Sequence, residues 1–133
     1  MTMKIELLPL QIHGDSRGSL ISLEYAINIP FDIKRVYYIF NTKEGVTRGY
    51  HAHKQLKQIA IAITGSCDFT MDNGKERITL TLNNPAQGLL IDSCIWREMS
   101  NFTPDCVLMI LASNEYDESD YIRDYEEFKL MVK

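Results

Sequence analysis

The chain has 133 residues, of which 45% are hydrophobic and 24% charged, and its formal net charge is -4. These values are typical of a soluble globular protein with a proper core, and we expect one domain over residues 1–133. The acidic balance and the lack of a basic run argue against a nucleic-acid surface. The longest apolar stretch, around residues 59–63, is too short to cross a bilayer, and the N-terminus has no signal-peptide core.

The number and spacing of the cysteines indicate the redox state of the cellular compartment. Cys67, Cys94 and Cys106 are an odd number without Cys-x-x-Cys spacing. This set favours reduced thiols in a cytoplasmic protein over a disulfide framework.

Short β segments separated by turns fill most of the chain. Residues 35–40 are β-branched and aromatic, residues 19–25 alternate between apolar and polar, and Asn73-Gly74 between two β runs is a strong hairpin signal. The expected strands are residues 4–12, 19–25, 35–40, 49–53, 56–64, 67–71, 77–82, 88–91, 95–101 and 106–112, with a turn at 13–18.

The C-terminal pattern is different. From residue 119 onward, apolar side chains recur at helical spacing among acidic residues, which predicts one short helix. With the strands before it, this predicts an all-β sandwich or barrel of the jelly-roll kind, with polar side chains lining a cavity in one mouth.

Two histidines stand at the centre of the sequence, in the stretch Gly49-Tyr-His51-Ala-His53. In a strand, side chains at i and i+2 point to the same face, so the two imidazoles should lie together. Such a pair can bind a metal or move a proton. Structural histidines without a chemical role, and a zinc or iron site with a further ligand, are the alternatives.

The central stretch resembles the first motif of the cupin superfamily, in which Gly, His-x-His, an acidic residue and Gly follow one another at fixed spacing. Those positions are Gly45, His51, His53, Gln58 and Gly65. The resemblance implies a cupin jelly-roll barrel, here with a short C-terminal helix.

The second cupin motif ends in a histidine and an asparagine, and its best placement puts Arg97 and Asn101 there. Two of the metal positions therefore hold Gln58 and Arg97. An amide is a poor substitute for a carboxylate, and a guanidinium cannot ligate and carries a positive charge. We expect a metal-free cupin that needs no cofactor.

More specific similarities span residues 15–128. Asp15-Ser-Arg17-Gly18 resembles a motif of metal-free cupin sugar epimerases that act on thymidine-diphosphate-linked 4-keto-6-deoxyhexoses. The stretches Arg48-Gly-Tyr-His-Ala-His53, Ile95-Trp-Arg-Glu-Met99 and Tyr121-Ile-Arg-Asp-Tyr125 are similar to those of the TDP-4-keto-6-deoxy-D-glucose 3,4-ketoisomerases, isomerases of bacterial surface-sugar biosynthesis.

The resemblance implies a reaction that moves a ketone from C4 to C3 through an enediol. This reaction needs a base, a donor for the enolate oxygen and no redox cofactor. We assign His51 as the base and His53 as a second proton-transfer group or a polariser of the carbonyl, although their roles could be exchanged. Tyr37 is a candidate donor to the sugar oxygens.

Arginine binds phosphate oxygens in pairs, so Arg17, Arg48 and Arg97 are candidate contacts to the diphosphate of the TDP-linked sugar, and Arg97 could instead steady the oxyanion. The family that the chain resembles is dimeric, and the resemblance implies a homodimer that exchanges its N-terminal strands, residues 2–12. We expect no membrane partner.

Two other functions stay open at this point. A metal-free 3,5-epimerase would need an acid and a base on opposite faces of the sugar ring, which a histidine pair on one strand face favours less. A non-catalytic cupin would bind a nucleotide sugar and leave it unchanged, and the fold alone does not separate it from an enzyme. The sequence leaves the C4 configuration of the product open.

Overall fold

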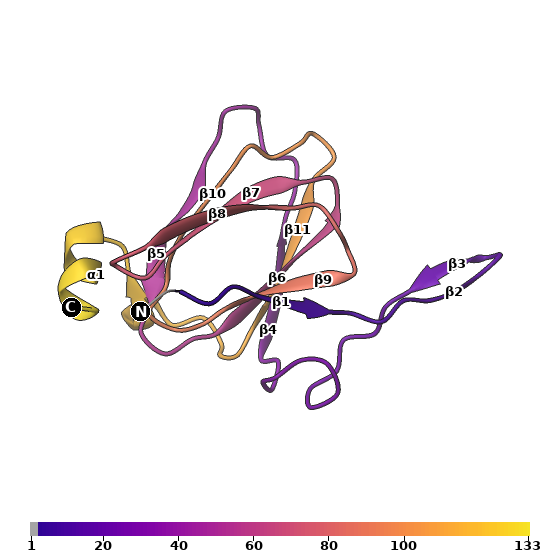
Figure 1. Cartoon of the computed structure of the whole chain (residues 1–133), viewed down its shortest axis with the longest axis horizontal. Coiled ribbons are helices and arrows are strands. Elements are labelled where there is room, and N and C mark those ends of the chain that lie inside the picture. Colours follow the sequence, from indigo (N-terminus) through magenta and orange to yellow (C-terminus); the bar gives the residue numbers. More distant parts are fainter. Residues whose placement is uncertain (1–2) are drawn as a thin grey trace.

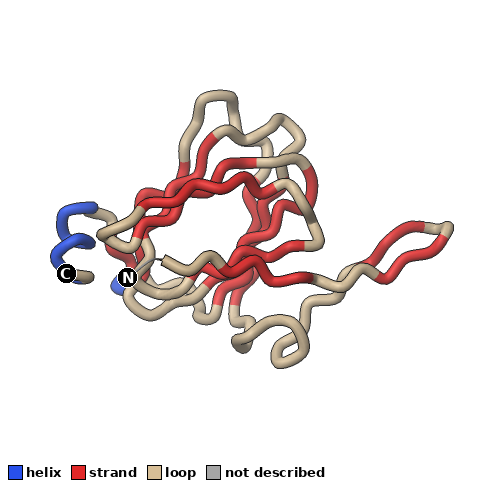
Figure 2. Tube along the Cα trace, in the orientation of Figure 1, coloured by secondary structure: helices blue, strands red, loops and turns tan. Residues whose placement is uncertain are grey.

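A computed structural model describes residues 3–133 and shows two antiparallel sheets facing each other. The first sheet has the order β1-β9-β6-β11-β4, and the second has the order β12-β5-β10-β7-β8. Figure 2 shows the strands arranged around the centre of the molecule and joined by loops and turns. This confirms the predicted all-β jelly-roll barrel.

The strands of the first sheet are β1 (Glu6–Pro9), β4 (Arg35–Ile39), β6 (Gln58–Thr64), β9 (Gln87–Ile91) and β11 (Val107–Ala112). Those of the second are β5 (Arg48–His53), β7 (Cys67–Asp72), β8 (Arg77–Leu82), β10 (Trp96–Ser100) and β12 (Tyr121–Ile122). Most predicted strands therefore exist, with ends shifted by a few residues.

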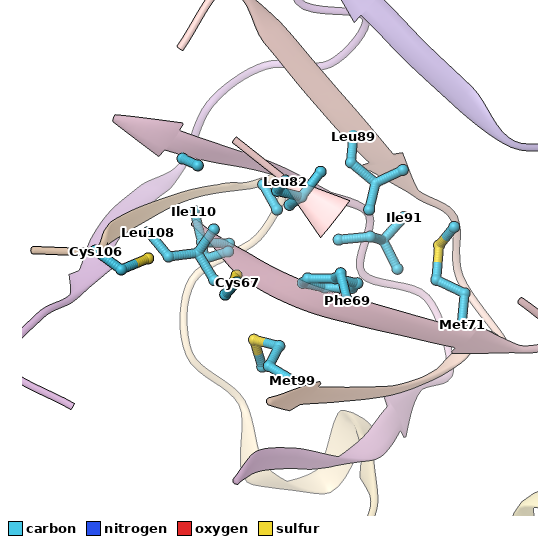
Figure 3. Close-up of a cluster of buried hydrophobic side chains, with 12 residues drawn as sticks. Cys67, Phe69, Met71, Leu82, Leu89, Ile91, Met99, Cys106, Leu108 and Ile110 are labelled. Atoms are coloured by element: carbon cyan, nitrogen blue, oxygen red, sulfur yellow. The ribbon is translucent and has the colours of Figure 1, made fainter. Parts of the chain in front are cut away.

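The main core lies between the two sheets, where apolar side chains from both inner faces meet. Phe69 and Met71 on β7 pack there with Leu89 and Ile91 on β9 (Figure 3). Burying a side chain of this size stabilises a fold by about 1.5–3 kcal/mol. All three cysteines are free, and Cys67 and Cys106 are buried in this same core.

A two-stranded arm projects from the barrel. Strands β2 (His13–Asp15) and β3 (Gly18–Leu20) form a hairpin that extends from the body at the end opposite the helix (Figure 1). Ile12 and Leu20 are 53% and 60% exposed on it. The predicted turn at residues 13–18 is thus the tip of a hairpin.

The predicted strand over residues 19–25 is wrong beyond Leu20. Ile21 and Leu23 are half-buried and pack against the body, while Ser22 and Glu24 are exposed. The alternation in the sequence therefore reflects burial on one side of the segment. Within the described residues, however, no neighbouring strand forms a ladder with it.

The predicted C-terminal helix is correct only in its second half. The chain forms a 3-10 turn (Glu118–Asp120), then β12, and then α1 (Tyr125–Met131). Tyr121 and Ile122, which were expected in the helix, pair instead with His53 and Ala52 of β5. Phe128 of α1 is fully buried against Trp96 and Ile122, and this packing holds β12 on the sheet edge.

None of the helices in residues 3–133 is long and apolar enough to span a membrane.

Candidate active site

A cavity of about 550 Å³ opens between β4, β5 and the segment that runs from Tyr116 through β12. Tyr37 and His51 lie in its wall, so the structure brings these two predicted site residues together. Tyr37 faces inward because it alternates with the exposed residues Val36 and Tyr38 along β4. Arg48 lines the same cavity.

The hydrogen bonding of His51 fixes its tautomer. Its Nδ1 lies 3.1 Å from the carbonyl oxygen of Gly49, which can only accept, so Nδ1 carries the proton. The lone pair is therefore on Nε2. Gly49 has a φ of 93°, and a Cβ atom there would lie 2.9 Å from the carbonyl oxygen of Arg97, so glycine is required.

The imidazole of His51 is held neutral. Burial and the positive charge of Arg97 lower its pKa to about 4. At neutral pH the ring is therefore neutral, with its one proton on Nδ1, and able to accept a second proton at Nε2.

His53 lies behind His51 and is fully buried. The two rings are 4.9 Å apart between centroids, edge to face, which confirms that the side chains share a face of β5. The ring of Tyr121 covers His53 at 4.3 Å, so His53 does not reach the cavity wall.

The surroundings keep His53 neutral as well. Its Nδ1 is 3.4 Å from a carboxylate oxygen of Asp120, but the geometry makes no hydrogen bond; that carboxylate accepts from the backbone N–H groups of Gln55 and Leu56. Burial, followed by the charge of Arg97, lowers the pKa of His53 to about 2. The nearby carboxylate does not offset these two effects.

Arg97 lies beneath the cavity rather than on its wall, with 1% of its surface exposed. Its Nη1 donates to Oε1 of Gln58, and its Nη2 donates to the carbonyl oxygen of Ile95 at 2.9 Å. Burial lowers the pKa of Arg97 to about 10, which leaves the guanidinium charged at neutral pH.

The positions of the cupin metal ligands hold two imidazoles, one amide and one guanidinium. Gln58 and Arg97 hydrogen-bond to each other. In residues 3–133 there is no group of three or more His, Cys, Asp or Glu side chains arranged to hold a metal ion. The donor set is therefore not that of a cupin metal centre.

Arg17 does not line this cavity. It sits at the tip of the β2–β3 arm and is exposed, with its Nη2 2.6 Å from a carboxylate oxygen of Asp15. The structure does not bring it to the other predicted site residues within one copy of the chain.

The cavity also contains residues that the sequence analysis missed. The guanidinium of Arg35 lies 5.3 Å from the ring centroid of Tyr37 and 5.6 Å from that of Tyr116. Its Nε and Nη2 are buried and have no hydrogen-bond partner among the described residues. The signal was available, because Arg35 and Tyr37 are two apart on one strand and so share a face.

Arg123 stacks at 4.3 Å over the ring of Tyr121 and pairs with Glu118 at 2.9 Å. Both Tyr121 and Arg123 line the cavity. This stretch carries part of the resemblance to the ketoisomerases, but its helical spacing predicts that Tyr121 lies on a helix face rather than in a cavity wall.

Comparison with known proteins decides the family. A family model described as "FdtA: WxcM-like, C-terminal" matches residues 3–133. The chain belongs to this family. The TDP-4-oxo-6-deoxy-alpha-D-glucose-3,4-oxoisomerase of Aneurinibacillus thermoaerophilus is 53% identical over 118 residues, which cover 89% of this chain and 85% of that protein.

Solved structures agree. A 3,4-ketoisomerase from Helicobacter canadensis is 46% identical with a TM-score of 0.95, covering 98% of both chains. The 3,4-ketoisomerase QdtA from Thermoanaerobacterium thermosaccharolyticum, solved with TDP, is 43% identical with a TM-score of 0.96, covering 99% of this chain and 96% of that one. A His-to-Asn variant of QdtA was solved with TDP-4-keto-6-deoxyglucose. The predicted resemblance to the 3,4-ketoisomerases is confirmed.

Proposed function

We propose that the chain is a 3,4-ketoisomerase that converts TDP-4-keto-6-deoxy-D-glucose into the corresponding 3-keto sugar. The observation that carries this proposal is His51, a neutral imidazole whose Nδ1 is held by Gly49 and whose ring faces a cavity shared with Tyr37. Relatives that are 43–53% identical and named as 3,4-ketoisomerases support it.

The proton on C3 of the substrate is acidic because it is α to the C4 ketone. In the proposed reaction, Nε2 of His51 takes this proton, the C3–H electron pair forms the C3=C4 double bond, and the C4 oxygen becomes an enolate. The proton of the C3 hydroxyl then passes to the C4 oxygen, and a proton is delivered to C4 as the electrons on the C3 oxygen form the new C3=O bond, so the ketone ends at C3 and the hydroxyl at C4. Nothing is oxidised or reduced overall, and the mechanism needs no cofactor.

The enolate oxygen needs a hydrogen-bond donor, and we assign Tyr37 to this role. Burial raises the pKa of its phenol, so the hydroxyl stays protonated at neutral pH. His53 supports His51 from behind, as a neutral ring that does not compete for the proton. Arg97 adds a fixed positive charge beneath the site that favours an anionic intermediate.

We place the diphosphate of the substrate near Arg35, Arg48 and Arg123, the three arginines that line the cavity. The unpartnered, buried nitrogens of Arg35 make it the first choice. This proposal differs from the phosphate contacts expected from the sequence, because Arg97, one of those candidates, is buried beneath the cavity.

We also propose a homodimer. The outer face of β4 presents Val36 and Tyr38, and Phe40 follows directly after the strand; these side chains are 52%, 62% and 56% exposed, and a second copy would cover them. Exchange of residues 2–12 would replace the pairing of β1 with β9 of its own chain by the same pairing across the dimer; residue 2 of that range lies outside the described residues. Arg17 would then come to a site through the partner's arm.

We further propose a cytoplasmic location, which the unpaired cysteines support, and a role in the biosynthesis of a deoxyamino sugar for bacterial surface glycans.

The test is an assay of the purified, chelator-treated protein with TDP-4-keto-6-deoxyglucose in deuterated water, followed by proton NMR. The proposal predicts a 3-keto sugar that carries deuterium at C4, and no conversion by the His51→Asn variant. Deuterium at C3 and C5 with the ketone still at C4 would indicate a 3,5-epimerase. Nucleotide-sugar binding without exchange would indicate a binding module.

A further inference from the structure

A series of side-chain hydrogen bonds crosses the inside of the barrel from one sheet to the other. Arg97 on β10 donates to Oε1 of Gln58 on β6, and Nε2 of Gln58 lies 2.9 Å from the hydroxyl oxygen of Tyr37 on β4. Arg97 and Gln58 are 1% and 2% exposed, so water does not compete with the bond between them. This series of bonds ends at the cavity, because Tyr37 lines the cavity wall.

Arg97 determines which group donates and which accepts in both of these hydrogen bonds. A guanidinium has only donors, so the group that faces it must be the carbonyl oxygen of the Gln58 amide. The NH₂ group of Gln58 then faces Tyr37 and can only donate. The hydroxyl oxygen of Tyr37 is therefore the acceptor of this bond.

A phenol has one proton, and Tyr37 cannot give that proton to a group that is itself donating. No other described residue accepts a hydrogen bond from the Tyr37 hydroxyl. The proton is consequently free to point toward the cavity, on the same wall as His51.

We propose that Gln58 is a positioning residue, which holds the Tyr37 hydroxyl as a hydrogen-bond donor to the substrate oxygen that becomes the enolate. This inference rests on the proposed function. At a position where a metal-binding cupin has an acidic ligand, this chain has an amide, which can accept from Arg97 and donate to Tyr37 at once. A carboxylate in its place would accept from both.

The decisive variant is Gln58→Glu, which keeps the side-chain size and the pairing with Arg97 but removes the donor. The Tyr37 hydroxyl would then donate to the new carboxylate and turn away from the substrate. Losing one donor to a developing oxyanion costs about 10²–10³-fold in kcat. We expect a loss of that size in Gln58→Glu, with KM changed little.

The same loss is expected in Tyr37→Phe, and combining the two changes should cost no more than either alone, because both remove one hydrogen bond. A purely structural role for Gln58 predicts instead that the losses multiply. Gln87→Glu is the matched control, because it makes the same chemical change at an exposed position on β9 and should leave activity unchanged.

Binding of TDP and a cooperative thermal transition show whether each variant is folded. If Gln58→Glu does not fold, Gln58→Met replaces it, and its loss of activity must disappear in the Tyr37→Phe background. Unchanged kcat in Tyr37→Phe, or losses that multiply, would overturn the inference. An inactive wild-type protein would instead overturn the proposed function, so the two failures are distinguishable.

Discussion

At the scale of single residues, the site depends on a histidine that stays neutral. Burial and Arg97 both disfavour the protonated form of His51, and its bond to Gly49 places the lone pair on Nε2. The site therefore has a base that is ready to act without first losing a proton. An ordinary histidine, with a pKa of about 6.5, would be partly protonated near neutral pH.

This difference predicts the pH dependence of the free enzyme. Since the pKa of His51 is lowered to about 4, the base stays active as the pH falls from 7 to 5, and kcat/KM should fall only as the pH approaches about 4. Initial rates measured after brief pH jumps test this, with full recovery of activity at pH 7 as the control. A fall in kcat/KM centred near pH 6.5 would contradict it.

The charge of Arg97 is one cause of this lowered pKa, second to burial. Removing this charge in the Arg97→Met variant should raise the pKa of His51. The fall of kcat/KM at acidic pH should therefore lie at a higher pH than in the wild type, whatever happens to the absolute rate. An unchanged position of the fall would mean that burial alone sets the pKa of His51.

At the scale of elements, the C-terminal segment completes the cavity. Strand β12 pairs with β5 and places Tyr121 over both histidines, and α1 holds β12 in place through buried Phe128. The hydroxyl of Tyr125 also donates to buried Asp72 at 2.6 Å, which ties α1 to β7. Side chains far from the chemistry thus position a wall of the site.

Phe128→Ala should lower the free energy of unfolding by about 3–5 kcal/mol, because it removes a fully buried aromatic ring. KM should also rise, since Tyr121 and Arg123 lose their support. Denaturant unfolding and steady-state kinetics measure the two effects. Leu130→Ala on the same helix is the control, because Leu130 is 72% exposed, and an equal loss there would contradict the assignment.

The sequence predicted this level of structure unevenly. The β-branched and aromatic run over residues 35–40, and the hairpin signal beside residues 77–82, identified real strands, in which half-buried and exposed side chains alternate. Tyr121 and Ile122 were assigned to a helix because their spacing to Tyr125 and Phe128 fits one. Their true partners, His53 and Ala52, are distant in sequence, and no local pattern encodes that pairing.

The site was predictable to a similar extent. The His-x-His spacing placed His51 and His53 on one face, and the inward face of β4 brought in Tyr37. Full burial of His53 and Arg97 could not be predicted, because it depends on side chains such as Tyr121 that reach over them from another part of the chain.

At the scale of the whole molecule, the arm and the outer face of β4 leave apolar surface uncovered in one copy of the chain. Tyr38 is 62% exposed next to exposed Val36 and Phe40, and Leu20 is 60% exposed on the arm. Monomeric proteins rarely expose contiguous apolar patches of this kind. We expect a dimer by light scattering at micromolar concentration.

Tyr38→Lys would place a charge in this face and should shift the protein toward monomer, while Lys43→Glu, a charge change at an exposed loop, should not. A wild-type protein that remains monomeric at high concentration would contradict the proposed dimer.

The central claim is that Nε2 of His51 takes the C3 proton. The most direct measurement uses TDP-4-keto-6-deoxyglucose deuterated at C3, incubated in ordinary water and followed by NMR. We predict that the wild-type protein removes the C3 label as the ketone moves to C3, and that His51→Asn binds the nucleotide sugar but leaves the label in place. Loss of the label at the wild-type rate in His51→Asn would contradict the account.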